Sequence, residues 1–333
     1  MFRETIVTTR DVREMLDVIL QRPGLFGLSS PAPMSRYDID GIANALRRSR
    51  DVTHNIRHGG RIRPMPSRDV LDAVVADLSA ALFPSHYSQS ESGAEAFDGF
   101  VCGTLSTALG LLEEQVRRGL NFTHEDLLSA EGLDRKALEI TRAFAAKLPA
   151  IRILLVGDLR AALEGDPAAS NAPEILLGYP GMAALIHHRL AHVLHRLGAG
   201  LPARLIADLA RAKTAIDMHP GAEIGEGLFI DHGMGVVIGE TAIIGQGVRL
   251  HQGVTLGGRH AATGVQLKGQ PRHPIVEDDV VIHAGATVLG RVTIGRGSVI
   301  GGNVCVTTSV PPGSRLASAT ASQRGCDGQP LLD

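Results

Sequence analysis

Two polar groups interrupt a chain of short aliphatic segments and carry its candidate chemistry. The first lies in residues 229–240, FIDHGMGVVIGE, where Asp231 and His232 stand side by side. Asp217 lies 15 residues before His232, and a carboxylate that accepts the Nδ1 proton of an imidazole leaves Nε2 free as a base. This arrangement suits the removal of a proton from a hydroxyl or an amine.

The second polar group closes a long insertion, residues 257–273, with the sequence GGRHAATGVQLKGQPRH. Loops of this length inside a repeat array are usually functional or disordered. The insertion ends in Arg272 and His273, so a cation and an imidazole are fixed where the aliphatic pattern resumes.

The elements that must position these groups form a six-residue repeat that begins near residue 216. One aliphatic register holds Met218, Ile224, Ile230, Ile238, Ile244, Leu250, Leu256, Val276, Ile282, Val288, Ile294, Ile300 and Val306. Three six-residue sides make a coil of about 18 residues, and stacked coils bury a column that no single coil can bury. The pattern therefore predicts a parallel β-helix over residues 216–313, with an inserted loop at 257–273.

The repeat slips by two residues between Ile230 and Ile238, the segment that contains Asp231 and His232. Because the aliphatic side chains on both flanks keep their inward positions, the extra residues must bulge outward from a corner of the prism. The slip is therefore expected to display both polar side chains on the outside. A plain solvated corner is the alternative interpretation.

The N-terminal part of the chain has the period of helices. Apolar stripes run over residues 70–82 after the cap candidate Ser67, over 101–119, and over 133–148 with a stop at Pro149. The expected organisation is an extension that is partly helical or flexible (1–65), a helical domain (66–215), the β-helix (216–313) and a flexible tail (314–333).

Together these motifs resemble those of serine O-acetyltransferases, which make O-acetylserine for cysteine synthesis. The resemblance rests on D-x-H-P at 217–220, D-H-G at 231–233, G-E-T at 239–241 and R-H-P at 272–274. It extends upstream through DLRAALEGDPAA and LLGYPGMAALIHHRLAHVL, whereas hexapeptides alone would indicate only the broad acyltransferase superfamily. The chain is similar to the longer bacterial form, which implies an α+β fold with a helical domain before a left-handed parallel β-helix.

The resemblance assigns the reaction to His232 and Asp217. His232 is the expected general base that takes the proton of the serine hydroxyl, and Asp217 orients and supports it. The serine oxygen then attacks the thioester carbonyl of acetyl-CoA, and no acyl-enzyme is needed.

The resemblance also assigns the residues that bind the two substrates. Arg272 and His273 are expected to hold the serine carboxylate, while Asp166 and Asp231 meet its ammonium group, and His273 counts among the catalytic residues as well. The positions that match the acetyl-CoA site are Gly257, Gly258, Ala284, Gly285, Gly301, Gly302 and Asn303.

Partners are implied in the same way. Acetyl-CoA lies between neighbouring β-helices of a trimer in this family, so a homo-oligomer is expected, either a trimer or a dimer of trimers joined through the helical domain. Acetyl-CoA is a co-substrate, and neither a permanently bound cofactor nor a metal is expected. Inhibition by cysteine is implied, since cysteine resembles serine. Members that bind O-acetylserine sulfhydrylase end in isoleucine, whereas this sequence ends in Leu331, Leu332 and Asp333, which does not favour that partner.

Two other functions stay open. A hexapeptide acyltransferase acting on another amino acid or a sugar would keep His232 but would not need Asp166, Arg272 and His273 together. A non-catalytic β-helix scaffold would make the slip and the position of Asp217 coincidental.

The remaining histidines do not point to a metal site. His188, His192 and His195 share one face of a predicted helix without an acidic partner, and His251 and His283 lie near the candidate cleft by register. A β-helical zinc carbonic anhydrase would need a His-x4-His pair, which is missing between residues 216 and 313.

Composition excludes several broad classes of function. With a net charge of -2 and 3% aromatic residues, the sequence gives no support to nucleic-acid binding, which needs a basic face and stacking rings. No apolar run reaches the length of a membrane span, and the N-terminus lacks the apolar stretch of a signal peptide. The three scattered cysteines, Cys102, Cys305 and Cys326, suit a reduced protein, so a cytoplasmic location is expected.

Overall fold

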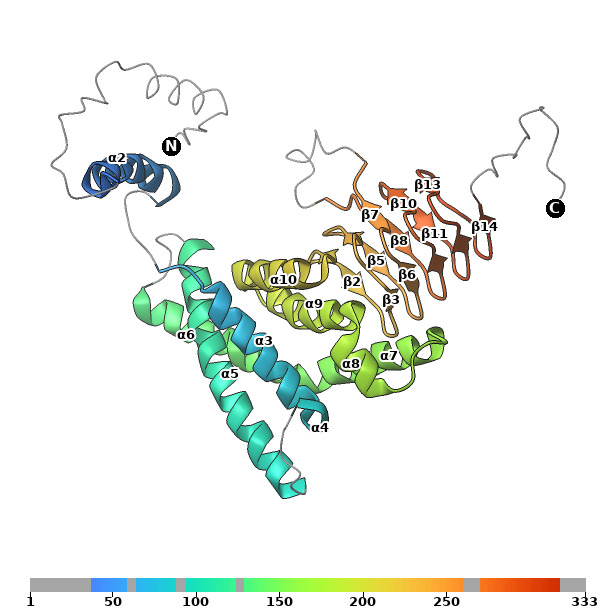
Figure 1. The fold of residues 1–333 in the computed structure, drawn as a ribbon, viewed down its shortest axis with the longest axis horizontal. Coiled ribbons are helices and arrows are strands. Elements are labelled where there is room, and N and C mark those ends of the chain that lie inside the picture. Colours follow the sequence, from blue (N-terminus) through green and yellow to red (C-terminus); the bar gives the residue numbers. More distant parts are fainter. Residues whose placement is uncertain (1–36, 59–63, 88–93, 124–128, 260–269, 318–333) are drawn as a thin grey trace, which may run out of the picture. The chain divides into compact units, whose positions relative to one another are not determined.

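The computed structural model describes residues 37–58, 64–87, 94–123, 129–259 and 270–317 (Figure 1). The chain divides into two units, Met1–Ile62 and Arg63–Asp333. The first unit contains helix α2, Ile39–His58, within the extension that we expected to be partly helical. Most of the inserted loop and most of the predicted tail lie outside the described residues. Within the described ranges, no helix is both long enough and apolar enough to cross a membrane.

Helices form the first half of the second unit. Their order is α3 (Arg68–Leu82), α4 (Pro84–Tyr87), α5 (Ala94–Thr123), α6 (Ala130–Ala145), α7 (Leu148–Gly165), α8 (Ala172–Gly178), α9 (Pro180–Arg196) and α10 (Gly200–Thr214). Ser67 caps α3 as predicted, because its hydroxyl accepts the N–H of Val70 at 3.3 Å. The apolar stripes face one another across α3, α5 and α6, with Leu71, Leu112 and Phe144 fully buried.

Two predicted helix ends are wrong. Helix α5 continues past Gly119 to Thr123, and the glycine serves packing instead, since a Cβ there would come within 2.7 Å of Pro202 on α10. Pro149 does not stop the helix before it but lies in the first turn of α7. A proline is tolerated at that position because the first N–H groups of a helix have no intrahelical partner.

The second half is the predicted left-handed parallel β-helix, built from three parallel sheets that each take one short strand per coil (Figure 1). Sheet A contains β1 (Asp217–Met218), β4 (Val237–Ile238), β7 (Thr255–Gly257), β10 (Thr287–Leu289) and β13 (Cys305–Val306). Sheet B contains β2 (Glu223–Ile224), β5 (Ile243–Ile244), β8 (Ile275–Val276) and β11 (Thr293–Ile294). Sheet C contains β3 (Phe229–Asp231), β6 (Arg249–His251), β9 (Val281–Ile282), β12 (Val299–Ile300) and β14 (Arg315–Leu316). The predicted aliphatic register fills the prism, as shown by Ile238, Leu250 and Ile282, which are at most 1% exposed.

The β-helix extends beyond its predicted end at residue 313. Strand β14 pairs with β12 in parallel register, Val299 opposite Arg315. Pro311 and Pro312 do not end the last coil because they lie at a corner, and the ladder bond beyond them is made by the N–H of Val299 to the carbonyl of Ser314 at 2.8 Å.

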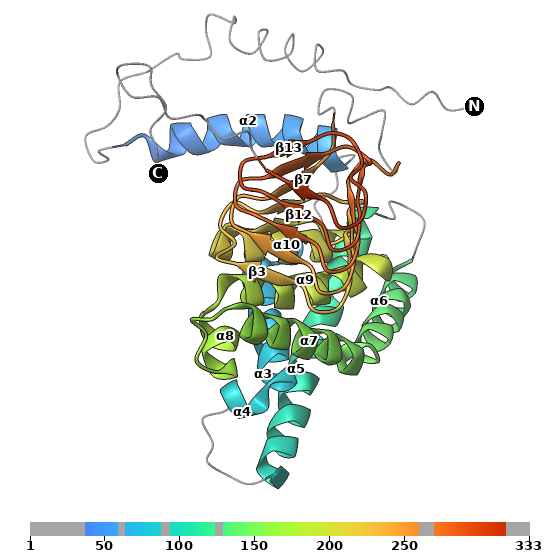
Figure 2. The ribbon, with the colours of Figure 1, turned by 90° about the vertical axis from the view of Figure 1, so that its right-hand side faces the viewer.

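Helices close the open lower end of the β-helix, which has no coil beneath it (Figure 2). Arg189 of α9 donates to the carbonyls of Ile224 and Gly225 at 2.5 and 2.6 Å. Asp158 of α7 accepts the N–H of Leu228 at 3.0 Å and pairs with Arg189 at 2.9 Å. This buried pair therefore supplies the hydrogen bonds that a preceding coil would have made.

Candidate functional site

His232 lies where the sequence slip predicted, at the corner between β3 of sheet C and β4 of sheet A. We call this corner, together with the corner residues stacked on it in later coils (251–254, 283–286 and 301–304), the His232 edge. The backbone of His232 is left-handed, with φ of 57°, and the N–H of Gly233 closes a tight turn on the carbonyl of Asp231 at 2.7 Å. The side chain of His232 is 78% exposed, so the imidazole is displayed on the surface as expected.

Asp231 is the anchored member of the pair. It is 13% exposed, and its Oδ2 accepts a hydrogen bond from Arg249 at 2.6 Å and lies 3.3 Å from Nδ1 of His251. Its Oδ1 lies 3.7 Å from Nε2 of His232. The ring of His251 in turn stacks on that of His283, with centroids 4.9 Å apart. One carboxylate oxygen is therefore held by β6, and the other faces the candidate base.

Asp166 reaches the same edge from the helical domain. It is the C-cap residue of α7, and its carboxylate accepts the hydroxyl of Tyr179 at 2.7 Å and the N–H of Ala168 at 2.9 Å. The Tyr179 hydrogen bond, with a smaller contribution from Arg249, lowers the pKa of Asp166, and the same bond raises the pKa of Tyr179 to about 12. Asp166 is therefore an anion near neutral pH.

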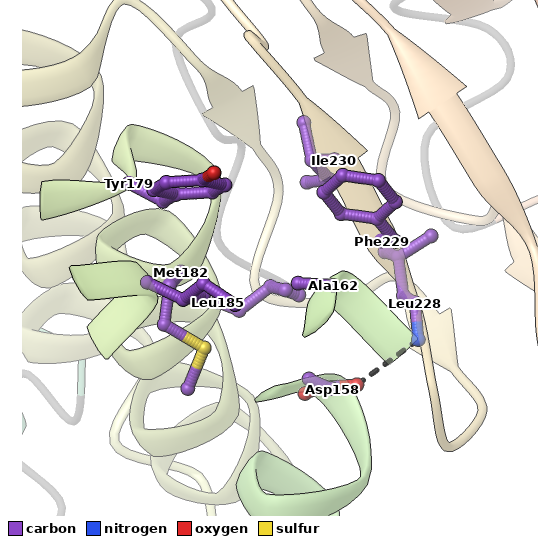
Figure 3. Close-up of a pocket in the computed structure, with 9 residues that line it drawn as sticks. Asp158, Ala162, Tyr179, Met182, Leu185, Leu228, Phe229 and Ile230 are labelled. Carbon is purple, nitrogen blue, oxygen red and sulfur yellow. Dashed lines mark hydrogen bonds between the residues drawn. The ribbon is translucent and has the colours of Figure 1, made fainter. Parts of the chain in front are cut away.

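The ring of Tyr179 is positioned by the packing between α9 and β3. It lines a cavity of about 10 Å³, across which Phe229 and Ile230 of β3 face Met182 and Leu185 of α9 (Figure 3). A space of that size holds about one water molecule, so the cavity is part of the packing and not a substrate pocket. Its apolar walls fix the tyrosine that holds Asp166.

Arg272 and His273 lie at a different corner, between β7 of sheet A and β8 of sheet B. We call this corner, with Glu240 and Thr241 of the coil before it, the Arg272 edge. Arg272 pairs with Glu240 at 2.7 Å. The hydroxyl of Thr241 accepts the N–H groups of Arg272 and His273 at 2.9 and 3.1 Å, so it anchors the end of the inserted loop.

The hydrogen bonds of His273 decide its chemical role. Its Nδ1 accepts the N–H of Thr241 at 3.0 Å, so the neutral imidazole carries its proton on Nε2. Burial, together with the charge of Arg272, lowers the pKa of His273. His273 is thus arranged as a hydrogen-bond donor through Nε2. Its ring lies over Gly239, where a Cβ would come within 2.0 Å of it.

The predicted residues therefore fall into two groups on two corners that flank sheet A. Asp166, Asp231 and His232 share the His232 edge, while Arg272 and His273 share the other. Asp217 lies on β1 beneath Val237, close to the His232 edge, but no hydrogen bond or ion pair of the described residues joins it to His232.

The predicted acetyl-CoA positions are divided in the same way. Ala284 and Asn303 stack on the His232 edge, where the N–H of Asn303 donates to the carbonyl of Ala284 at 2.9 Å. Gly285, with φ of 71°, lies beside Asn303, and a Cβ on it would come within 2.3 Å of the asparagine amide. Gly301 and Gly302 belong to the same stack. Gly257 and Gly258 instead lie on the Arg272 edge, where Gly258 packs against the Arg272 side chain.

Comparison with known proteins decides the family. Residues 273–308 match the family model for the bacterial transferase hexapeptide (six repeats). A serine acetyltransferase encoded on a plasmid of Synechococcus elongatus is 47% identical over 293 residues, which cover 85% of this chain and 91% of that protein. The chain belongs to the serine acetyltransferase family. It is therefore an acyltransferase.

Other serine acetyltransferases match over shorter or more distant alignments. That of Helicobacter pylori is 51% identical over 163 residues, 49% of this chain and 92% of that protein. The crystal structure of serine acetyltransferase 1 of Entamoeba histolytica in complex with L-cysteine superposes with a TM-score of 0.65 at 33% identity, covering 83% of this chain and 96% of that one. The isoform 3 enzyme of the same organism, in complex with cysteine, gives a TM-score of 0.66 at 27% identity over 94% of this chain and 92% of that one.

Four residues to which the sequence analysis gave no role shape the candidate site, although Glu240 and Thr241 belong to its G-E-T motif. Tyr179 holds Asp166, Arg249 holds Asp231, and Glu240 and Thr241 hold the Arg272 edge. A signal for Arg249 was present: the slip makes the first coil 20 residues long, so Phe229 and Asp231 stack on Arg249 and His251.

The histidines of α9 pack against the first coil. The rings of His188 and His192 stack with centroids 5.7 Å apart, and those of His195 and His219 meet edge to face at 5.8 Å. Nδ1 of His219 accepts the N–H of Gly221 at 2.9 Å. Burial lowers the pKa of His188 and of His192, and it lowers the pKa of His219 to about 4. Neutral imidazoles therefore fill this interface.

Proposed function

We propose that the protein transfers the acetyl group of acetyl-CoA to the hydroxyl of L-serine, with His232 as the general base. The observation that carries the proposal is the division of charge in the site. Two carboxylates, Asp166 and Asp231, flank the exposed imidazole, while the complementary group consists of the Arg272 cation and the neutral His273, which donates through Nε2. A zwitterionic amino acid needs one group of each kind.

The reaction follows from these positions. His232 takes the proton of the serine hydroxyl, and the oxygen attacks the thioester carbonyl of acetyl-CoA. The tetrahedral intermediate collapses with breakage of the C–S bond, and the protonated imidazole returns its proton to the leaving thiolate. O-acetyl-L-serine and CoA are the products, so protons and electrons balance. Asp217 is proposed to stabilise the imidazolium once substrate is bound.

The site is proposed to be completed between subunits. The anionic and cationic groups flank opposite sides of sheet A in one protomer, so a compact substrate meets both only where the His232 edge of one copy faces the Arg272 edge of another. A cyclic trimer provides that contact three times with the same surface pair. The split acetyl-CoA positions support the same arrangement, since both edges would border one groove.

Replacement of the base tests the chemistry. In a thiol-release assay with acetyl-CoA, L-serine should be acetylated, and L-homoserine and amino sugars should react poorly.

His232→Asn should lower kcat by about 10²- to 10⁴-fold while acetyl-CoA still binds. His86→Asn, at a half-buried histidine of α4 outside both edges, is the matched control and should behave as the parent protein. Wild-type turnover by His232→Asn would refute the proposed base, and preference for a sugar would refute the substrate.

Mixed oligomers test the shared site. His232→Asn and Arg272→Gln should each be almost inactive alone, yet co-expressed copies with different affinity tags should regain activity. The gain is expected because an Arg272→Gln subunit contributes an intact His232 and its neighbour an intact Arg272. Hybrids that are as inactive as both parents would place the complete site within one protomer.

A further inference from the structure

Arg249 occupies an unusual position on the outer face of sheet C. It lies on β6 directly above Phe229, and its guanidinium stacks on the phenyl ring with 5.0 Å to the centroid. The side chain is 30% exposed, but its Nε is buried and has no hydrogen-bond partner among the described residues. Leaving a buried donor unpaired costs stability, so the arginine carries a local cost at this position.

The two terminal nitrogens of Arg249 bridge the two halves of the molecule. One donates to Oδ2 of Asp231 at 2.6 Å, and the other donates to the carbonyl of Gly165 at 2.8 Å. Gly165 is the last residue of α7 and immediately precedes Asp166. A Cβ at Gly165 would come within 2.8 Å of the Phe229 ring, so the contact between the helix end and the strand depends on glycine. One guanidinium thus connects the Asp231 carboxylate to the backbone of the residue that precedes Asp166.

We propose that Arg249 is a positioning residue of the amino-acid site, which fixes Asp166 relative to Asp231 by joining the carbonyl of Gly165 to the Asp231 carboxylate. The proposal rests on the proposed function, because it concerns how those two carboxylates meet the substrate ammonium group. Arg249 binds Oδ2 of Asp231 and so leaves Oδ1, the oxygen nearest His232, for the ammonium.

The positive charge of Arg249 has a second effect on the same site. Arg249 lies against the Asp231 carboxylate, and it bonds the carbonyl of Gly165, the residue before Asp166. The charge of Arg249 acts in the same direction as the Tyr179 hydrogen bond on the pKa of Asp166.

Steady-state kinetics of Arg249→Gln test this role. The KM for L-serine should rise about 10- to 100-fold, as expected when two hydrogen bonds to a charged group are lost. The kcat should stay within about threefold of the parent value, and the KM for acetyl-CoA should not change, because His232 and the other edge are intact. Arg249→Lys should restore little, since an ammonium group is a point charge and does not reproduce the two-pronged fork of a guanidinium.

A double variant separates positioning from general damage. If Arg249 acts through Asp231, Arg249→Gln combined with Asp231→Asn should raise the serine KM little beyond the larger single effect. Arg315→Gln is the matched control, because Arg315 is exposed in the same column of sheet C at the far end of the prism. It should leave both KM values unchanged.

Two results would overturn the inference. One is an Arg249→Gln or Arg249→Lys enzyme with the parent KM for serine. The other is a double variant in which the effects of the two single substitutions on the serine KM, expressed as free energies, add in full. The parent enzyme is assayed first with L-serine, L-homoserine and amino sugars as acetyl acceptors. If it does not acetylate serine, the proposed function fails. If it does acetylate serine but the Arg249 variants keep the parent KM for serine, only the positioning role fails.

Discussion

Two aspartate–arginine pairs connect helix α7 to the β-helix, and they differ in almost every physical respect. Asp158 and Arg189 lie under the first coil with 0% and 4% of their side chains exposed, and they bond each other and the backbone of the first coil. Asp231 and Arg249 lie at the His232 edge with 13% and 30% of their side chains exposed, and within the described part of the chain Oδ1 of Asp231 has no donor nearer than Nε2 of His232 at 3.7 Å.

The difference separates a structural pair from a site pair. The first pair replaces backbone bonds that a missing coil would have made, and each side-chain nitrogen and oxygen of the pair has a hydrogen-bond partner in the protein. The second pair leaves one carboxylate oxygen at the edge, where a ligand can approach. Burial and complete hydrogen bonding therefore predict an effect on folding, while partial exposure predicts an effect on substrate binding.

The largest effect on folding is expected from Asp158→Ala. It leaves the buried Arg189 cation without a counter-charge and the N–H of Leu228 without a partner. Loss of one member of a buried pair typically costs about 3–5 kcal/mol. Urea unfolding at a fixed protein concentration should show this loss of stability.

Replacement of both partners gives the control for that experiment. Asp158→Leu combined with Arg189→Met removes both charges and should cost less than Asp158→Ala alone, since no lone charge stays buried. If the double variant loses more free energy of unfolding than Asp158→Ala, the hydrogen bonds from Arg189 to Ile224 and Gly225 contribute more to stability than the pairing of the two charges.

Glycine replacements compare the two regions directly. At Gly181 of α9, a Cβ would come within 2.3 Å of the carbonyl oxygen of Ile230, which is backbone and cannot move aside. Gly181→Ala should cost about 1–3 kcal/mol. At Gly165, the nearest atom is in the Phe229 ring, at 2.8 Å. Gly165→Ala should lower the free energy of unfolding by less than Gly181→Ala. It should raise the serine KM, because Arg249 stacks on the Phe229 ring that the new Cβ displaces.

The reverse pattern would contradict the comparison. Equal unfolding free energies for Gly181→Ala and the parent protein would mean that α9 is not closely fitted to the first coil. An unchanged serine KM in Gly165→Ala would separate the helix end from the amino-acid site.

The sequence predicted the β-helix well because its physics is periodic. Each aliphatic residue of the register has the same neighbours one coil away, so spacing alone locates the core, the slip and the outward position of His232. The C-terminal end of the β-helix was harder to predict. Pro311 and Pro312 indicated that the last coil ends there, but they lie at a corner where no backbone donor is needed for the strand pairing.

The contacts between the helices and the β-helix could not be predicted from spacing. Asp158 and Arg189 are separated along the chain by 31 residues with no common period, and only the docked helices show that both meet the first coil. The position of Arg249 next to Phe229 and Asp231 could have been predicted, because residues of adjacent coils stack in a known register. It was missed because a charged residue on an outward position is ordinarily solvated.

Acid should weaken the interface under the first coil through its histidines. Burial lowers the pKa values of His188, His192 and His219, the last to about 4, whereas an unfolded histidine titrates near 6.5. Between these values the unfolded chain binds more protons than the folded one, so the free energy of unfolding should fall as the pH drops from about 6.5 towards 4. Urea unfolding at several pH values measures the slope.

A single substitution identifies the histidine responsible for part of that slope. His219→Asn retains an acceptor for the N–H of Gly221, which lies two residues on, but it cannot be protonated. It should flatten the loss of stability in acid. The same slope in His219→Asn and the parent protein would assign the acid sensitivity to other groups.

The smallest effect on folding is expected from Asp231→Asn, the counterpart of the first variant. Because the pair is partly exposed and the amide oxygen can still accept from Arg249, the free energy of unfolding should change by less than about 1 kcal/mol. The KM for serine should nevertheless rise strongly, because the carboxylate charge that meets the ammonium group is gone. A stability loss as large as that of Asp158→Ala, with unchanged serine binding, would mean that the two pairs do the same structural work and that exposure does not distinguish them.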